Sequence, residues 1–268
     1  MEAIRLFVSL PFQKDGTAQD YPDCIRSFRA PELNRYLAAL QREIPAAAEG
    51  LEDCVVTELQ FGLGSFCHIP ADDLEALYQR IRDAFSVSRS VTVRLRATPR
   101  GFDFYRLTAA RHLNEAVIDF LTPTLDEEAL ARLNFAPAAQ TLAALEVCFQ
   151  AGYHRFSCTV SPLHNPTATI LRDTLSRLLP KRPGAFLFDA PLSAEQAGLV
   201  RELLSESYEE RGGGWFLPGF QLPHEPLEQI GCGLVAVTEL EGVRVKTSTD
   251  LNYYCEHADD FEALVQPV

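Results

Sequence analysis

Short apolar runs alternate with longer amphipathic stretches along most of this chain. The apolar runs are rich in aliphatic and β-branched residues, which is typical of strands that are buried on both faces. Because strand and helix patterns alternate, they indicate βαβ units and a parallel sheet. The runs predict strands at residues 4–10, 54–61, 91–96, 116–120, 155–160 and 185–189.

The amphipathic stretches carry apolar residues at helical spacing. Leu33, Leu37 and Leu40 share one face of the first stretch, as expected for a helix that packs on a sheet. Gly152 follows a later stretch, at the place where a glycine commonly ends a helix. The stretches predict helices at residues 31–44, 71–85, 102–112, 126–133, 138–151, 167–179 and 193–208.

The pattern changes after residue 208. The glycine run 212–214 and the prolines at 218, 223 and 226 interrupt any helix, and residues 234–240 and 243–247 predict a hairpin that turns at Glu241-Gly242. The expected organisation is therefore a (β/α)6 unit over residues 1–210 and a C-terminal extension over residues 211–268 that packs on it. Periodicity alone does not separate an open (β/α)6 barrel from a doubly wound sheet.

Composition and charge narrow the class of protein. The chain has 268 residues, 47% of them hydrophobic, and a net charge of −13. An acidic surface repels phosphodiester backbones, so we expect no nucleic-acid partner. No apolar run approaches the ~20 residues that span a bilayer, and the N-terminus lacks the features of a signal peptide. The seven cysteines show no paired metal-ligand spacing, which indicates reduced thiols and a cytoplasmic location.

Several motifs resemble one known family. Pro11-Phe12 ends the first strand, residues 61–66 read FGLGSF, and residues 91–99 form a strand that ends in proline. The tail contains Gly231-Cys-Gly233, then Gly242-Val-Arg, Thr249-Asp-Leu and Tyr254. Together they resemble the radical SAM proteins of the oxygen-independent coproporphyrinogen III oxidase and HemW-type heme chaperone group. The resemblance implies an α/β fold, an open (β/α)6 partial TIM-type barrel with a short C-terminal β-hairpin extension.

The chain departs from that family at the positions that carry its chemistry. The family's CxxxCxxC cysteines correspond to Gln13, Thr17 and Asp20, and a [4Fe–4S] cluster is held by cysteine thiolates. Leu63 interrupts the glycine turn that would approach SAM, and Arg96 replaces a glutamate that would accept its ammonium group. We therefore expect neither a [4Fe–4S] cluster nor SAM, no other metal site, and no catalytic residue.

The remaining candidates lie where the predicted strands end, since barrel proteins build their sites there. We expect a ligand site at this barrel mouth from Ser65, His68, Arg96, His164 and Asn165. Heme is the cofactor alternative, with His68 or His164 as axial ligand and Arg96 on a propionate. The competing interpretation of the histidines is solvent-facing loop residues. Three further cysteines, Cys67, Cys158 and Cys232, are expected to be buried structural residues.

Two functions are compatible with these sequence features. The first is a non-catalytic pseudoenzyme relative of the oxygen-independent coproporphyrinogen III oxidases, which binds a tetrapyrrole or serves as a scaffold for a protein partner. The aromatic segment 215–220 is the predicted docking element, and a cap over the open side of the barrel is its alternative. The second is an enzyme with new chemistry at the barrel mouth, which would use Arg96, His164, His68 or Cys67. The resemblance alone would imply a coproporphyrinogen III oxidase-like oxidoreductase, which the missing cysteines contradict.

Overall fold

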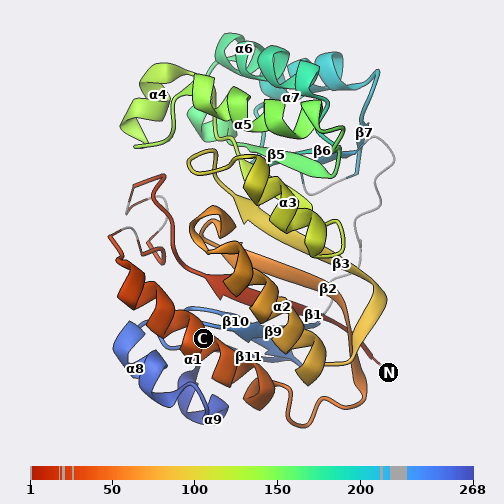
Figure 1. The fold of residues 1–268 in the computed structure, drawn as a ribbon. Helices are drawn as coiled ribbons and strands as arrows, with labels where there is room; N and C mark the ends of the chain where they lie inside the picture. Colours follow the sequence, from red (N-terminus) through yellow and green to blue (C-terminus); the bar gives the residue numbers. More distant parts are fainter. Residues whose placement is uncertain (1, 18, 20–21, 26, 212–213, 218–227) are drawn as a thin grey trace.

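The computed structural model describes residues 2–17, 19, 22–25, 27–211, 214–217 and 228–268. Its centre is a parallel sheet in which consecutive strands lie side by side from β1 to β6. The sheet is curved and has two free ends, so the barrel is open, as predicted (Figure 1). These strands are β1 (Glu2–Leu10), β2 (Cys54–Leu63), β3 (Val87–Ala97), β4 (Val117–Leu121), β5 (Phe156–Val160) and β6 (Ala185–Phe188).

Helices follow the strands in the predicted order. Alternation along β1 explains how they pack, because Ile4, Leu6 and Val8 are fully buried while Arg5 and Phe7 between them keep partial exposure. Helices α1, α2 and α3 lie next to one another over β1–β3 (Figure 1). The helices are α1 (Ala30–Ala47), α2 (Ala71–Ala84), α3 (Phe104–His112), α4 (Glu127–Arg132), α5 (Ala138–Gln150), α6 (Ala168–Leu178) and α7 (Ala194–Leu204).

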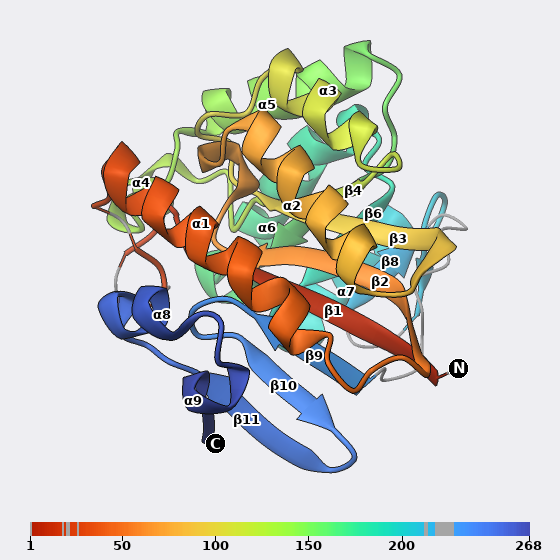
Figure 2. The ribbon, with the colours of Figure 1, turned by 60° about the horizontal axis from the view of Figure 1, so that its bottom comes forward.

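The C-terminal residues extend the same sheet beyond β1. Strand β9 (Glu228–Cys232) pairs with β1 in parallel, a strand that the sequence pattern did not predict. The predicted hairpin is present as β10 (Val237–Leu240) and β11 (Val243–Thr247), and both turn residues, Glu241 and Gly242, have positive φ. Strand β12 (Val265–Pro267) forms the outer edge, and helices α8 (Leu251–His257) and α9 (Phe261–Leu264) pack on α1 (Figure 2).

The opposite edge of the sheet also carries late segments of the chain. Strand β8 (Trp215–Leu217) pairs antiparallel with β6, and β7 (Glu209–Glu210) pairs with β8. The first part of the predicted docking segment is therefore a sheet strand, whereas residues 218–220 lie outside the described residues. Segments after residue 210 thus pair with the sheet at both of its edges, beyond β1 and beyond β6. The division into two domains at residue 210 stays a prediction.

Two predicted elements are shorter than expected by three or more residues at one end. Residues 234–236 form a loop instead of the start of a strand, because Val235 adopts a left-handed backbone with φ 66°. Helix α7 ends at Leu204, and Tyr208 beyond it packs on Phe186 and donates to the carbonyl of Pro183. No helix in the described part of the chain has the length and apolarity required to cross a membrane.

Candidate functional site

The loop after β1 lies at the entrance of the barrel, yet two of its polar residues are buried. Gln13 and Asp15 are both fully buried. Nε2 of Gln13 donates to the backbone oxygen of Asp15 (2.8 Å), and its backbone N–H donates to Ile25 (3.1 Å). Thr17 is part of the same loop, and Asp20 lies outside the described residues. The side-chain amide of Gln13 therefore helps to hold the conformation of this loop.

Asp15 joins this loop to the loop after β3. Its Oδ1 lies 3.2 Å from Nε of Arg100. Burial raises the pKa of the Asp15 carboxyl, while the hydroxyl of Thr98 and the charge of Arg100 act to lower it. An ion pair with one fully buried partner thus connects the loops that follow β1 and β3.

The turn after β2 is packed against the end of β1. A Cβ on Gly64 would lie 2.5 Å from the carbonyl oxygens of both Leu10 and Phe12, so only glycine fits. Leu63 before it holds a left-handed backbone with φ 71°. Ser65, a predicted ligand residue, is fully buried, and its Oγ accepts from the backbone N–H groups of Cys67 (3.3 Å) and Thr98 (3.0 Å). Its hydroxyl therefore links the ends of β2 and β3.

His68 stands at the same side of the mouth. Its Nε2 accepts from the backbone N–H of Lys14 at 3.3 Å, and its ring lies 5.9 Å from that of Phe28. Burial, together with the nearby charges of Lys14, Arg106 and Arg100, lowers the pKa of His68 to about 4. The imidazole is therefore neutral near pH 7, with one ring nitrogen already in a hydrogen bond.

A second group forms around Asp189, which follows β6. Burial raises the pKa of this carboxyl, while a hydrogen bond with Ser161 and the electrostatic effects of His164 and Arg96 act to lower it. Arg96 belongs to β3, and His164 ends the 3₁₀ turn Pro162–His164 after β5. Asp189, which sequence reasoning missed, is therefore within electrostatic reach of both Arg96 and His164.

The two candidate histidines belong to different parts of the mouth. His68 follows β2 and His164 follows β5, with β3 and β4 between them. At a usual strand spacing this separation is about 14 Å along the sheet. A ligand site therefore takes His68 or His164, in line with the alternative left open by the sequence.

The side-chain amide of Asn165 has a structural role. It is fully buried, and its Oδ1 accepts from the hydroxyls of Thr124 and Thr174, both at 2.9 Å. Its Nδ2 donates to the carbonyls of Pro123 (2.8 Å) and Ser161 (2.7 Å). These four bonds use the hydrogen-bonding capacity of the amide, so nothing is left for a ligand.

The inner face of the sheet is polar near the mouth. Arg96, Asp119 and Ser157 lie in register across β3, β4 and β5. Oδ1 of Asp119 accepts from Nη2 of Arg94 (2.8 Å) and from Oγ of Ser157 (2.5 Å). The signal for this group is present in the sequence, because Asp119 is a single charged residue inside an apolar strand. Sequence reasoning did not use it.

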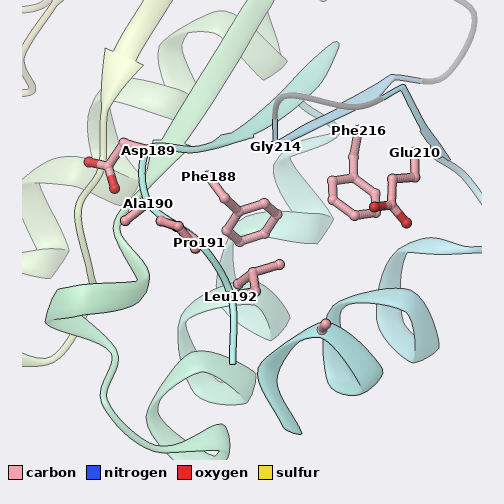
Figure 3. A pocket seen from close by; sticks show the side chains of 9 residues that line it. Phe188, Asp189, Ala190, Pro191, Leu192, Glu210, Gly214 and Phe216 are labelled. Atoms are coloured by element: carbon pink, nitrogen blue, oxygen red, sulfur yellow. The ribbon is translucent and has the colours of Figure 1, made fainter. Parts of the chain in front are cut away.

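A pocket of about 510 Å³ opens beside Asp189, between the end of β6, β8 and α7 (Figure 3). Phe188 and Phe216 form its aromatic wall in an edge-to-face pair with centroids 5.6 Å apart. Pro191 and Leu192 add apolar surface, and Asp189 stands at one side. The volume lies in the range of small-molecule sites.

The cysteines behave as predicted for structural residues. Cys67, Cys158 and Cys232 are buried, and burial raises the pKa of each thiol, for Cys67 to about 12. They are therefore protonated and unreactive near pH 7. Within the described ranges, no group of three or more His, Cys, Asp or Glu residues is arranged to hold a metal ion.

Solved structures with a similar fold identify the architecture. Coproporphyrinogen III oxidase (HemN) from Escherichia coli, a radical SAM enzyme, matches with a TM-score of 0.80 and 15% identity over 100% of this chain and 72% of that one. The chain has the radical SAM fold. Native anSMEcpe with bound AdoMet matches with a TM-score of 0.51 and 11% identity, over 76% of this chain and 60% of that one. No protein-family model matches the chain, and no curated protein is similar to it in sequence.

This fold implies an iron–sulfur cluster with SAM, and the residues present do not fit the cluster. Its irons require thiolates, whereas the loop after β1 offers the amide of Gln13 and the hydroxyl of Thr17. Cys24 is the nearest thiol along the described part of this loop, and its Sγ lies 3.5 Å from the carbonyl oxygen of Leu63. One thiol in a structural contact does not replace three ligands.

Proposed function

We propose that this protein is a non-catalytic member of the radical SAM fold that binds a tetrapyrrole at the barrel mouth. The non-catalytic part of this proposal rests on the burial of Gln13 and Asp15, which tie the loop after β1 to the protein. In the family that the sequence resembles, the position of Gln13 carries a cysteine that presents its thiolate to a cluster. Here the loop is a structural part of the entrance.

The residues around a SAM position support the same conclusion. Arg96 places a positive charge where the resemblance expects an acceptor for the SAM ammonium group, and like charges repel. Leu63 adds a side chain to the turn that would approach the cofactor. We therefore expect SAM to bind no more tightly than millimolar, about −4 kcal/mol.

The tetrapyrrole part of the proposal rests on Asp189, on Arg96 and His164, and on the pocket that Asp189 lines. A tetrapyrrole combines a flat apolar ring with carboxylate side chains. Phe188 and Phe216 offer an apolar wall, the Arg96 guanidinium suits a carboxylate, and the His164 imidazole suits a heme iron. The ligand class comes from the family resemblance and from the fold shared with a coproporphyrinogen oxidase.

A hemin titration tests this proposal. We expect stoichiometric uptake with a shifted Soret band, which weakens in His164→Ala and in Arg96→Gln. His112→Ala is the matched control, because His112 is exposed in the last turn of α3, away from the mouth. An absence of uptake by the wild type would leave a scaffold for a protein partner, and equal spectra in all variants would move the ligand elsewhere.

The alternative is an enzyme with new chemistry. Only some of the residues expected to carry that chemistry are suitable for it in the structure. Cys67 is protonated and buried, so it is a poor nucleophile near pH 7. Arg96 and His164 remain as candidates, and both act electrostatically on Asp189, which lines the pocket. Turnover that is lost in His164→Ala, without loss of the melting temperature, would favour the enzyme over the binding protein.

A further inference from the structure

The tail residues that resemble the family converge on one buried carboxylate. Glu43 of α1 is fully buried. Its Oε2 accepts from the backbone N–H of Gly233 (2.7 Å) and from the hydroxyl of Tyr254 (2.6 Å). Its Oε1 is buried without a hydrogen-bond partner. We call Glu43, Gly233 and Tyr254 the latch, because they join α1 to the loop after β9 and to α8.

The geometry of the latch depends on glycine. Gly233 has φ +98°, and an added Cβ would lie 2.5 Å from Oη of Tyr36 and 3.0 Å from the carbonyl oxygen of Ser9. Tyr36 donates to that carbonyl (2.7 Å) and accepts from the backbone N–H of Leu234 (3.2 Å). The loop is therefore held against α1 and β1 in one arrangement, with Glu43 inside it.

The groups that face Glu43 leave its charge uncompensated. They are Tyr36 on α1, Cys232 on β9 and Tyr254 on α8, and burial raises the pKa of each, so all stay protonated. Arg42 on the same helix is exposed and donates to the backbone oxygen of Cys255 (2.7 Å). An ionised Glu43 would thus rest on two hydrogen bonds, with its second oxygen unpartnered in a dry interior.

We propose that protonated Glu43 fastens residues 228–268 to α1 and that ionisation of Glu43 loosens the latch. Burial raises the pKa of Glu43 to about 7, and the bonds from Tyr254 and Gly233 only partly offset this effect. When the latch opens, water reaches the carboxyl and its pKa returns to the usual 4.5. Opening therefore becomes easier as the pH rises from 4.5 through about 7, and the part of this change that falls between pH 6 and pH 8 is about tenfold.

Hydrogen exchange at the amides of Gly233 and Leu234 tests the latch. The protection factor corrects for the intrinsic pH dependence of exchange, and we expect it to fall about tenfold between pH 6 and pH 8. Glu43→Gln keeps an acceptor for Tyr254 and Gly233 but has no charge, so its protection should stay level. Glu49→Gln, at an exposed position just after α1, is the matched control and should behave as the wild type.

A second variant keeps the test decisive if Glu43→Gln does not fold. Tyr254→Phe removes a bond that favours the ionised carboxylate, so the fall in protection should become steeper than tenfold over the same range. Level protection in the wild type would overturn the proposal. An equal fall in the wild type and in Glu43→Gln would also overturn it, because another group would then carry the titration.

Discussion

Oδ1 of Asp15 lies 3.2 Å from Nε of Arg100, which joins the loop after β1 to the loop after β3 at the entrance of the barrel. The carboxylate is fully buried and the guanidinium is partly exposed. The pair is an internal contact at the loop where the family that the sequence resembles carries its cluster cysteines. The stability of the entrance should therefore depend on it.

Arg100→Ala should lower the free energy of unfolding by about 1–3 kcal/mol, because it leaves a buried carboxylate without its cation. The loss should be larger at pH 8 than at pH 5, since the pKa of Asp15, already raised, rises further when Arg100 is removed. Denaturant unfolding at both pH values measures the change. Arg89→Ala, at an exposed position of β3, is the control and should leave stability nearly unchanged. An equal loss in both variants would show that the ion pair does not hold the entrance.

Anaerobic reconstitution with iron and sulfide should yield no [4Fe–4S] cluster, because the loop after β1 presents amide and hydroxyl groups in place of thiolates. Iron and sulfide analysis, together with the broad absorption near 400 nm, provides the measurement. Roughly four irons and four sulfides per chain would contradict the expectation. Cys24→Ser would then show whether the one thiol near this loop is a ligand.

Alanine substitutions at two glycines should change the stability in opposite directions. Gly64→Ala should lower stability by several kcal/mol or prevent folding, because the new Cβ meets two carbonyl oxygens at 2.5 Å. Gly198→Ala, inside α7 with nothing within 4 Å, should raise stability by about 0.5–1 kcal/mol. Thermal melting of both variants measures the contrast. A harmless Gly64→Ala would mean that the turn after β2 is not packed against β1 as described.

The stability of the whole chain should carry the signature of Glu43. Its folded pKa, about 7, lies above its usual 4.5, so its contribution is fully present below pH 4.5 and is lost as the pH rises through 7. Glu43→Gln removes this pH-dependent contribution to stability. The difference in unfolding free energy between variant and wild type should therefore move by about 2–3 kcal/mol in favour of the variant from pH 5 to pH 8. A constant difference would show that Glu43 does not titrate in this range.

The local pattern was sufficient to predict the strands β1–β6 and the helices α1–α7 in their correct order. This succeeded because periodicity records which positions of one element are buried, and that requires no knowledge of its partners. Strand β9 was missed, since residues 228–232 carry little apolar alternation and gain their strand conformation by pairing with β1. The sequence alone also placed Gln13, Thr17 and Asp20 where the family that it resembles has cluster cysteines.

Only the tertiary structure decided which side chains meet. Asp119 and Ser157 come from separate strands, and their contact depends on the register between β4 and β5. Asn165 was a plausible ligand residue until its four internal hydrogen bonds were seen. Glu43 was visible as a charge on the apolar face of the helix that carries Leu40, but its partners are 190 and 211 residues away. The sequence determined the elements because their burial is a local property, and the structure decided the sites because long-range pairing brings their residues together.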